Sequence, residues 1–432
     1  MIWAYRNHGA GRPFYSFRDP RKEIMFVQSR FCAAGAPQCY RLETGLSPLD
    51  CCAGTGRRWR CHSNRGQTMT RTPRPVHCGI NALLGIAIAA FICPALGAGS
   101  DADAKPSTEP LKIYFVDVEG GQATLFVTPE RQSLLVDTGW AGNNNRDADR
   151  IVAAAKKAGL NKIDYVLITH FHEDHAGGAP QLAAKISIGA FIDHGENREP
   201  ADAATVERWR AYQQLLATGK YKRIVAKPGD VLPLRGLRAT VVTADGATIS
   251  EPLPGGGEEN ALCKGAEPFP EDQTENRRSL GTVIQFGALR IVDLGDLTRD
   301  EETKLVCPRN LLGQVDIYIV SHHGWDQSNS AVFLNAIGPR VAVMDNGASK
   351  GGTPSAWDII KHSPRLEDLW QLHYSNAGGE AHNVPAEFIA NPPGPDAGYG
   401  LEILAWPDGR FEVINDRTHW AKTYAPQAAQ IH

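Results

Sequence analysis

From residue 111 onwards, short apolar runs alternate with polar turns rich in Gly and Pro, and this pattern predicts strands with helices between them. In the first half, the expected strands are residues 111–118, 123–127, 133–136, 162–169, 186–192, 222–226 and 238–242. In the second half, they are residues 279–286, 288–292, 315–320, 341–344, 400–405 and 410–414. Such a chain suits one large α/β domain with long loops.

Helical spacing of apolar residues is clearest in two segments. Residues 147–158 place Ile151, Val152, Ala155 and Ala158 on one face, and Gly159 stops the helix. Residues 201–218 carry a stripe with larger side chains: Val206, Trp209, Tyr212 and Leu216. This stripe is either part of the core or a lid over a substrate.

The longest irregular piece is residues 249–279, which contain several Pro and three consecutive Gly. Loops of this length are usually functional or disordered. Residues 99–110 are polar and hold two Pro, so we expect a disordered lead-in before a body spanning residues 111–425.

The first 98 residues differ in composition from the rest of the 432-residue chain. They hold 13 Lys and Arg against 4 Asp and Glu, so the remainder carries a net charge of about −12. They also hold seven of the nine Cys, without paired CxxC spacing. An acidic body is a poor partner for polyphosphate backbones, so stable binding of nucleic acid is not expected.

A second possible start, Met69, explains this division. It is followed by a basic stretch, a 12-residue apolar run at residues 82–93, and small residues up to Ala98. These are the parts of a secretory signal peptide, and the run is short for a membrane span. We expect residues 1–68 to lie outside the mature protein, residues 69–98 to be a signal peptide, and the enzyme to be periplasmic or secreted, with no membrane contact after processing. An N-terminal anchor is the alternative.

The remaining cysteines, Cys263 and Cys307, belong to the body. In an exported protein they can form a disulfide. Two free thiols are the alternative, because the sequence does not show that they are close.

A dense group of metal-binding side chains follows the predicted strand at residues 162–169. It comprises His170, His172, Asp174 and His175, and Gly177 and Gly178 then turn the backbone away. Neutral imidazole and carboxylate are the ligands that Zn²⁺, Mn²⁺ and Fe take. His170 and His172 point the same way in extended backbone and can hold one metal. Asp174 and His175, further round the bend, can serve a second one.

This group resembles the HxHxDH signature of the metallo-β-lactamase fold. Three further segments match the family in the expected order: residues 133–139 ending in Asp-Thr-Gly, residues 291–296 ending in Asp296, and Ser-His-His-Gly at residues 321–324. The resemblance covers residues 111–343. It implies a four-layer αββα sandwich with the metals at one rim, and in this superfamily long loops often cover the site.

The resemblance also implies roles for these residues. His170 and His172 would hold the first metal, whereas Asp174, His175 and a later histidine would hold the second, with Asp296 bridging the two. Two such ions, zinc or alternatively manganese or iron, lower the pKa of a shared water and produce hydroxide at neutral pH. Asp137 would fix a histidine tautomer, or is simply a turn residue before Gly139.

Two pairs of candidates require a choice. Of Asp293 and Asp296, only one should face the metals, and the position after Gly favours Asp296. His322 and His323 would point in opposite directions on a strand. We expect His322 to be the ligand and His323 to be a catalytic group near the leaving group, or else a packed histidine.

One family feature is missing. The hydrolytic lactamases carry a third histidine for the first metal in a GHTxG-like loop, whereas His194 is the only histidine between Ala176 and Asp296 here. His194 is therefore either a ligand or a rim residue that contacts substrate. The first metal site is expected to be weak.

This gap makes the body resemble the ComEC-type branch of soluble hydrolase domains most closely. The turn at residues 116–123 and Asn276, with Ser279 three residues later, match that branch, and Arg277 and Arg278 could bind an anionic substrate or be ordinary surface charges. The implied function is a metal-dependent hydrolase of a phosphodiester or related ester, with Asp174 and His323 in the reaction and a small or short anionic substrate. The alternatives are a β-lactamase or lactonase, and a non-catalytic metal-binding sensor.

Overall fold

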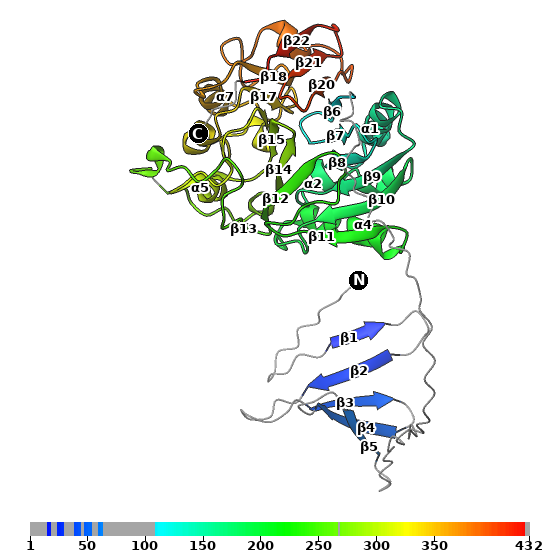
Figure 1. Cartoon of the computed structure of the whole chain (residues 1–432). Coiled ribbons are helices and arrows are strands. Elements are labelled where there is room, and N and C mark those ends of the chain that lie inside the picture. Colours follow the sequence, from blue (N-terminus) through cyan, green and yellow to red (C-terminus); the bar gives the residue numbers. More distant parts are fainter. Residues whose placement is uncertain are drawn as a thin grey trace, which may run out of the picture. The chain divides into compact units, whose positions relative to one another are not determined.

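The computed structural model describes residues 109–266 and 268–427 in full, and the backbone of five strands nearer the N-terminus. The chain divides into two units, Met1–Gly97 and Ala98–His432. The first contains an antiparallel sheet in sequential order (Figure 1): β1 Tyr15–Arg18, β2 Ile24–Ser29, β3 Cys39–Thr44, β4 Ser47–Ala53 and β5 Trp59–Ser63. The predicted signal peptide and residues 99–108 of the lead-in lie outside the described residues, and the exclusion of residues 1–68 from the mature protein stays a prediction.

The second unit is built on two mixed sheets. The nine-stranded sheet has the order β11-β10-β9-β8-β7-β6-β20-β21-β22. Its strands are β6 Leu111–Phe115, β7 Thr124–Val127, β8 Ser133–Val136, β9 Lys162–Leu167, β10 Ser187–Asp193, β11 Lys222–Val225, β20 Leu401–Ala405, β21 Phe411–Asn415 and β22 Ala421–Tyr424. The C-terminal hairpin thus pairs with the first strand of the unit, β6 with β20.

The eight-stranded sheet has the order β13-β12-β14-β15-β16-β17-β18-β19. Its strands are β12 Arg238–Ala244, β13 Ala247–Thr248, β14 Gly281–Phe286, β15 Leu289–Asp293, β16 Ile317–Ile319, β17 Val341–Met344, β18 Asp368–His373 and β19 Ile389–Asn391. Strands β15 to β19 are parallel, and each crossover between β15 and β18 carries a helix.

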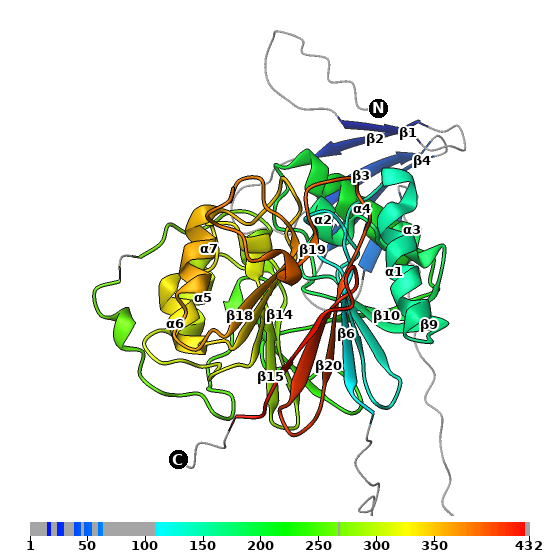
Figure 2. The same ribbon diagram turned by 90° about the horizontal axis from the view of Figure 1, so that it is seen from above.

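Helices cover the outer face of each sheet (Figure 2). On the nine-stranded sheet they are α1 Arg146–Lys157, α2 Glu173–Ala176, α3 Ala179–Ala183 and α4 Ala203–Ala217. On the eight-stranded sheet they are α5 Arg299–Val306, α6 Ala331–Ile337 and α7 Pro354–Lys361. Short 3₁₀ turns are η1 Asn143–Asn145, η2 Ala261–Cys263, η3 Asn276–Arg278, η4 Ser321–Gly324 and η5 Ala386–Phe388. Among the described residues, no helix has the length and apolar character needed to cross a bilayer.

Successive side chains along each strand point to opposite faces of the sheet, and the buried ones form three hydrophobic cores. In β15, Ile291 packs between the two sheets, whereas its neighbour Val292 packs under the helices. In β7, Phe126 and Leu125 divide in the same way. Both faces of both sheets are therefore buried, and the predicted four-layer αββα sandwich is confirmed.

The aromatic stripe of α4 belongs to the core. Trp209 and Tyr212 are buried against Phe171, with ring centroids 4.3 and 5.8 Å from the Phe171 ring. Of the two alternatives for this stripe, the structure therefore supports a place in the core and not a lid over a substrate. The packing also fixes Phe171, which separates His170 from His172 in sequence.

Cys263 and Cys307 form a disulfide, with Cα atoms 5.8 Å apart and 44 residues of sequence separation. The bond joins the long irregular segment to the end of α5, and so closes a loop that contains β14, β15 and Asp296. Of the two alternatives for these cysteines, the structure has the disulfide.

The double substitution Cys263→Ser/Cys307→Ser is expected to lower the free energy of unfolding by about 2–4 kcal/mol, because the unfolded chain regains the freedom of a long loop. Urea unfolding of the oxidised wild type and the variant measures the difference. Adding reductant should destabilise the wild type and leave the double variant unchanged; equal stability without reductant would contradict the expectation.

Candidate metal centre

The metal-binding side chains gather where loops from both sheets meet. The first group follows β9, where Phe171 turns into the core and the flanking His170 and His172 point the other way. Asp296 follows β15, and His322 and His323 follow β16. Sandwich topology therefore brings together residues that are more than 100 positions apart in sequence.

Four side chains form the centre of this site: Asp174, His175, Asp296 and His323. All are buried, and one ligand atom from each lies within 4.8 Å of the others. His175 Nε2 lies 3.1 Å from Asp174 Oδ2, 3.2 Å from Asp296 Oδ2 and 3.2 Å from His323 Nε2. Two imidazoles and two carboxylates this close are a donor set for a first-row divalent metal.

The outer nitrogens of these imidazoles are held by partners. His175 Nδ1 lies 2.7 Å from Asp137 Oδ2, and His323 Nδ1 lies 3.1 Å from Asp345 Oδ1. Thr169 donates its hydroxyl to Asp137 Oδ2 at 2.6 Å and contacts His170 Nδ1 at 3.1 Å. A ligating histidine commonly has its other nitrogen bonded in this way, which orients the ring.

Among the buried side-chain atoms that have no hydrogen-bond partner in the described residues are His170 Nε2 and Asp296 Oδ1. Buried polar atoms in native proteins are normally paired, so an unpaired nitrogen and an unpaired carboxylate oxygen at one centre fit a cation. His170 Nε2 lies 4.0 Å from Asp296 Oδ2. The residues present therefore fit the divalent metals that the sequence predicts.

His322 and His323 do not point in opposite directions, contrary to expectation. They lie in the turn η4 rather than in a strand, with φ values of 54° and 52°. In this left-handed backbone both rings reach Asp296, each Nε2 being 3.5 Å from a carboxylate oxygen. His323 belongs to the central four, whereas His322 Nε2 lies on the other side near Asn276 Nδ2, at 3.3 Å. Which of them is the ligand stays a prediction.

Asp293 is the last residue of β15 and Asp296 follows the strand, and of the two only Asp296 reaches the histidines. Asp293 accepts hydrogen bonds from Gln122 Nε2 at 2.8 Å and from the backbone of Gly295 at 3.1 Å. It therefore shapes the loop that carries Asp296. Burial raises the pKa of the Asp293 carboxyl to about 7.

The remaining predicted residues lie outside the central four. His172 Nε2 is 2.8 Å from Glu199 Oε2, which also accepts from the backbone of Glu275 at 3.0 Å. His194 Nε2 is 3.0 Å from Glu275 Oε2, and its ring packs on Phe171. Asn276 contacts His322. The Arg278 side chain donates from Nη1 to the carbonyl of Asp245 at 3.3 Å.

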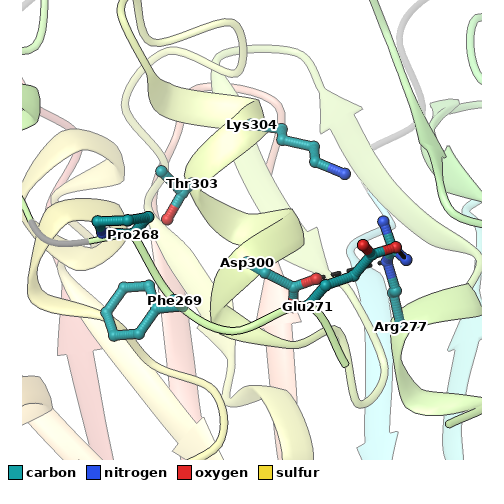
Figure 3. A pocket seen from close by; sticks show the side chains of 7 residues that line it. All are labelled: Pro268, Phe269, Glu271, Arg277, Asp300, Thr303 and Lys304. Atoms are coloured by element: carbon teal, nitrogen blue, oxygen red, sulfur yellow. Dashed lines mark hydrogen bonds and ion pairs between the residues drawn. The ribbon is translucent and has the colours of Figure 1, made fainter. Parts of the chain in front are cut away.

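Arg277 lines a pocket beside α5 and is surrounded by acidic groups (Figure 3). Its Nε donates to Glu301 at 2.6 Å and lies 3.4 Å from Asp300, and its Nη1 pairs with Glu271. The pocket also contains Pro268, Phe269, Thr303 and Lys304. Because three carboxylates face this guanidinium, Arg277 is poorly placed to bind an anionic substrate.

Mutual electrostatics set the charges of the central group. Burial alone would raise the pKa of Asp296, but His175, His322 and His323 hold it well below its usual range. Burial alone would lower the pKa of His175, but Asp296, Asp174 and Asp137 raise it well above its usual value. For His323, Asp296 and Asp345 outweigh burial and Lys350, and the pKa rises to about 9.

The electrostatics of the outer histidines differ. Burial, with the nearby His175 and His172, holds the pKa of His170 well below its ordinary value. Burial also lowers the pKa of His322 to about 4. These two imidazoles are therefore neutral at physiological pH, which is the form that binds metal.

Several site residues were not predicted from the sequence. Glu199, Asp345, Thr169 and Lys350 all contact a predicted ligand or its partner, and Lys350 Nζ pairs with Asp174 Oδ2. A second group, Asp117, Glu119 and His373, lies nearby in the fold, but Arg150 pairs with Asp117 at 3.1 Å. The only signal for Lys350 was its place in a Gly-rich loop after a predicted strand.

The chain is similar to several known proteins. Residues 116–257 match the model of the family described as the metallo-beta-lactamase superfamily. ComE operon protein 3 of Bacillus subtilis (strain 168) is 22% identical over 252 residues, which cover 55% of this chain and 28% of that protein. A hydroxyacylglutathione hydrolase of Albidiferax ferrireducens is 34% identical over 103 residues, 24% of this chain and 36% of that protein. A UPF0173 metal-dependent hydrolase of Cupriavidus metallidurans is 24% identical over 240 residues, 54% of this chain and 74% of that protein. The chain thus spans at most 36% of the length of the first two.

Glu199→Gln is expected to weaken one step of zinc binding by about 10–100-fold, because the partner of a ligating histidine orients and polarises its ring. Equilibrium dialysis with metal analysis measures the affinity and the number of ions bound. Glu196→Gln is the matched control, because Glu196 is 61% exposed and comes no closer than 4.0 Å to Arg223. Equal zinc affinities in the two variants would show that Glu199 does not support a metal ligand.

Zinc binding is expected to release about one to two protons near pH 7, because a histidine must be neutral to ligate. The raised pKa values of His175 and His323 mean that both carry a proton there before the metal enters. Affinity should therefore increase as pH rises from about 7 to 9. Calorimetry in buffers of different ionisation enthalpy counts the protons; a count of zero, or an affinity that falls over this range, would contradict the assignment.

Proposed function

We propose that this chain is a metal-dependent hydrolase of the metallo-β-lactamase superfamily and that its substrate is a phosphodiester or related anionic ester. The observation that carries the proposal is the buried group of Asp174, His175, Asp296 and His323, with two unpaired buried atoms beside it. Bound divalent metal, zinc as the first choice, would supply Lewis acidity and activate water at neutral pH.

The chain's own residues do the rest. Asp174, His175, Asp296 and one of His322 and His323 would hold the second metal, and His170 and His172 would hold the first. Asp137 and Asp345 orient His175 and His323. With His322 as the metal ligand, as the sequence predicts, His323 would be the group that protonates a leaving oxygen, and Asp345 would orient its ring.

Features around the centre favour a small anionic substrate. Lys350 brings a positive charge to Asp174. The turn at residues 116–123 presses against the centre, and a Cβ on Gly121 would lie 2.4 Å from the carbonyl oxygen of Asp174. The acidic body, about −12, opposes long polyanions, so stable nucleic-acid binding is not part of the proposal.

The sequence argues against a lactamase or lactonase. That chemistry needs a first metal with a full ligand set, and the GHTxG-like loop that would supply its third histidine is missing here. Similarity to a hydroxyacylglutathione hydrolase keeps an ester other than a phosphodiester as the second candidate.

Two features support export from the cytoplasm as part of the proposal. Residues 69–98 have the composition of a signal peptide, and the body contains a disulfide. Disulfides persist in oxidising compartments such as the periplasm. A processed enzyme of this kind would have no membrane contact.

Asp174→Asn is expected to reduce hydrolysis of bis-p-nitrophenyl phosphate by more than about 100-fold, because metal-based charge stabilisation is worth several kcal/mol. Glu173→Gln is the matched control, being the neighbouring carboxylate outside the central group. Initial rates with added Zn²⁺ or Mn²⁺ provide the comparison.

Nitrocefin and a homoserine lactone complete the substrate panel. Turnover of nitrocefin alone would overturn the phosphodiester proposal in favour of a lactamase. Metal binding without turnover of any of the three would favour a sensor.

A further inference from the structure

Two side chains beside the predicted metal ligands, Trp325 and Lys350, could contact a substrate. Trp325 directly follows the turn η4, and its indole stacks on the His322 ring at 5.7 Å with an interplanar angle of 17°. It is 36% exposed, and so is one of the few large apolar side chains on the described surface. One ring face is therefore covered by a residue of the centre while part of the indole remains open to solvent.

Lys350 supplies a positive charge next to this aromatic surface. Its Nζ pairs with Asp174 Oδ2 and lies 5.0 Å from the centroid of the Trp140 ring, and its side chain is 26% exposed. A cation so placed can bind an anionic oxygen once Asp174 is engaged elsewhere.

Backbone hydrogen bonds join the loops that carry these two residues. Gly352 N donates to the carbonyl of His323 at 2.9 Å, and Thr353 N donates to the carbonyl of Gly324 at 3.0 Å. The contact requires glycine, because a Cβ on Gly351 would lie 2.1 Å from the His323 carbonyl oxygen. Lys350 and Trp325 are therefore presented by one connected rim.

We propose that Trp325 and Lys350 together select substrates in which a flat ring accompanies a phosphate, with the ring stacked on Trp325 and a phosphate oxygen bound by Lys350. The proposal rests on the proposed function and defines the substrate class: an aryl or nucleoside phosphoester of small size. Stacking on an exposed aromatic side chain is sequence-tolerant and strong enough to decide specificity, at about 1–3 kcal/mol per ring. Lys350 recognises the phosphate as a point charge.

The test is equilibrium binding of three probes to the full-length protein loaded with zinc: inorganic phosphate, phenyl phosphate and thymidine 5′-monophosphate. The wild type should bind at least one of the two ring-bearing probes about 5–100-fold more tightly than inorganic phosphate, as expected for one stacked ring. A preference for the nucleotide identifies a nucleobase as the natural ring, whereas equal binding of the two ring-bearing probes identifies an aryl group.

Substitutions separate the two contributions. Trp325→Ala should bring all three affinities to within about 2-fold of one another, Trp325→Phe should restore the preference, and Lys350→Met should weaken all three by a similar factor. Trp406→Ala and Lys361→Met are the controls; the first removes an indole under Arg410, and the second a lysine over Trp357. The metal content of every variant is measured alongside.

A ring preference that survives Trp325→Ala, or its absence in the wild type, would overturn the proposal, as would unchanged phosphate binding in Lys350→Met. Hydrolysis is scored separately, with methyl p-nitrophenyl phosphate and thymidine 5′-p-nitrophenyl phosphate. Ring-dependent binding without hydrolysis of either ester would refute the proposed function and leave this inference standing. Hydrolysis of these esters, together with equal binding of the three probes, would support the proposed function and refute this inference.

Discussion

The carboxylate of Asp296 is the constraint on which the site depends. His170, His175, His322 and His323 all have Nε2 within 4.0 Å of one of its oxygens, and these histidines follow strands of both sheets. A buried negative charge is costly unless it is matched by positive charge or hydrogen bonds. Charged His175 and His323 supply that match before any metal enters, and Asp296 in turn raises their pKa values. Burial keeps His170 and His322 neutral. The same oxygens are then available to a cation, which replaces protons as the positive partner.

The sandwich makes this convergence possible through the alternation of side chains along its strands. Between His170 and His172, Phe171 is held in the helix-side core by Trp209 and Tyr212, so both histidines must face the site. On the other sheet, Ile291 and Val292 fill two different cores, and the strand ends at Asp293, whose bonds to Gln122 and Gly295 shape the turn into Asp296. Packing far from the chemistry therefore determines where the ligand atoms lie.

The site residues that could be predicted from the sequence are those marked by a local pattern. The group from His170 to His175, the strand ending in Asp137 and the late histidines could be found because each sits next to an apolar run. Glu199, Asp345 and Lys350 could not, because each is a single polar residue in a loop, and only the tertiary fold brings it to a histidine or aspartate of the centre. Strands β18 and β22 were missed for a related reason: they begin with charged residues or alternate weakly, and their pairing with β17 and β21 decides their conformation. The opposite orientation expected for His322 and His323 failed because the strand β16 ends at Ile319, before them.

The turn that carries those histidines links metal binding to substrate recognition. Two consecutive non-glycine residues with φ near 50° are uncommon, and such backbone persists only where the surroundings fix it. Here the amide of His322 donates to Gly295, next to Asp296, and the carbonyls of His323 and Gly324 accept from the loop that carries Lys350. A change in that loop would thus alter the histidines as well as the substrate rim. Lys350 is not a predicted ligand, but its loop contacts both the histidine turn and the proposed substrate rim. Because these contacts are made by backbone atoms, the Lys350 side chain can be replaced without removing them.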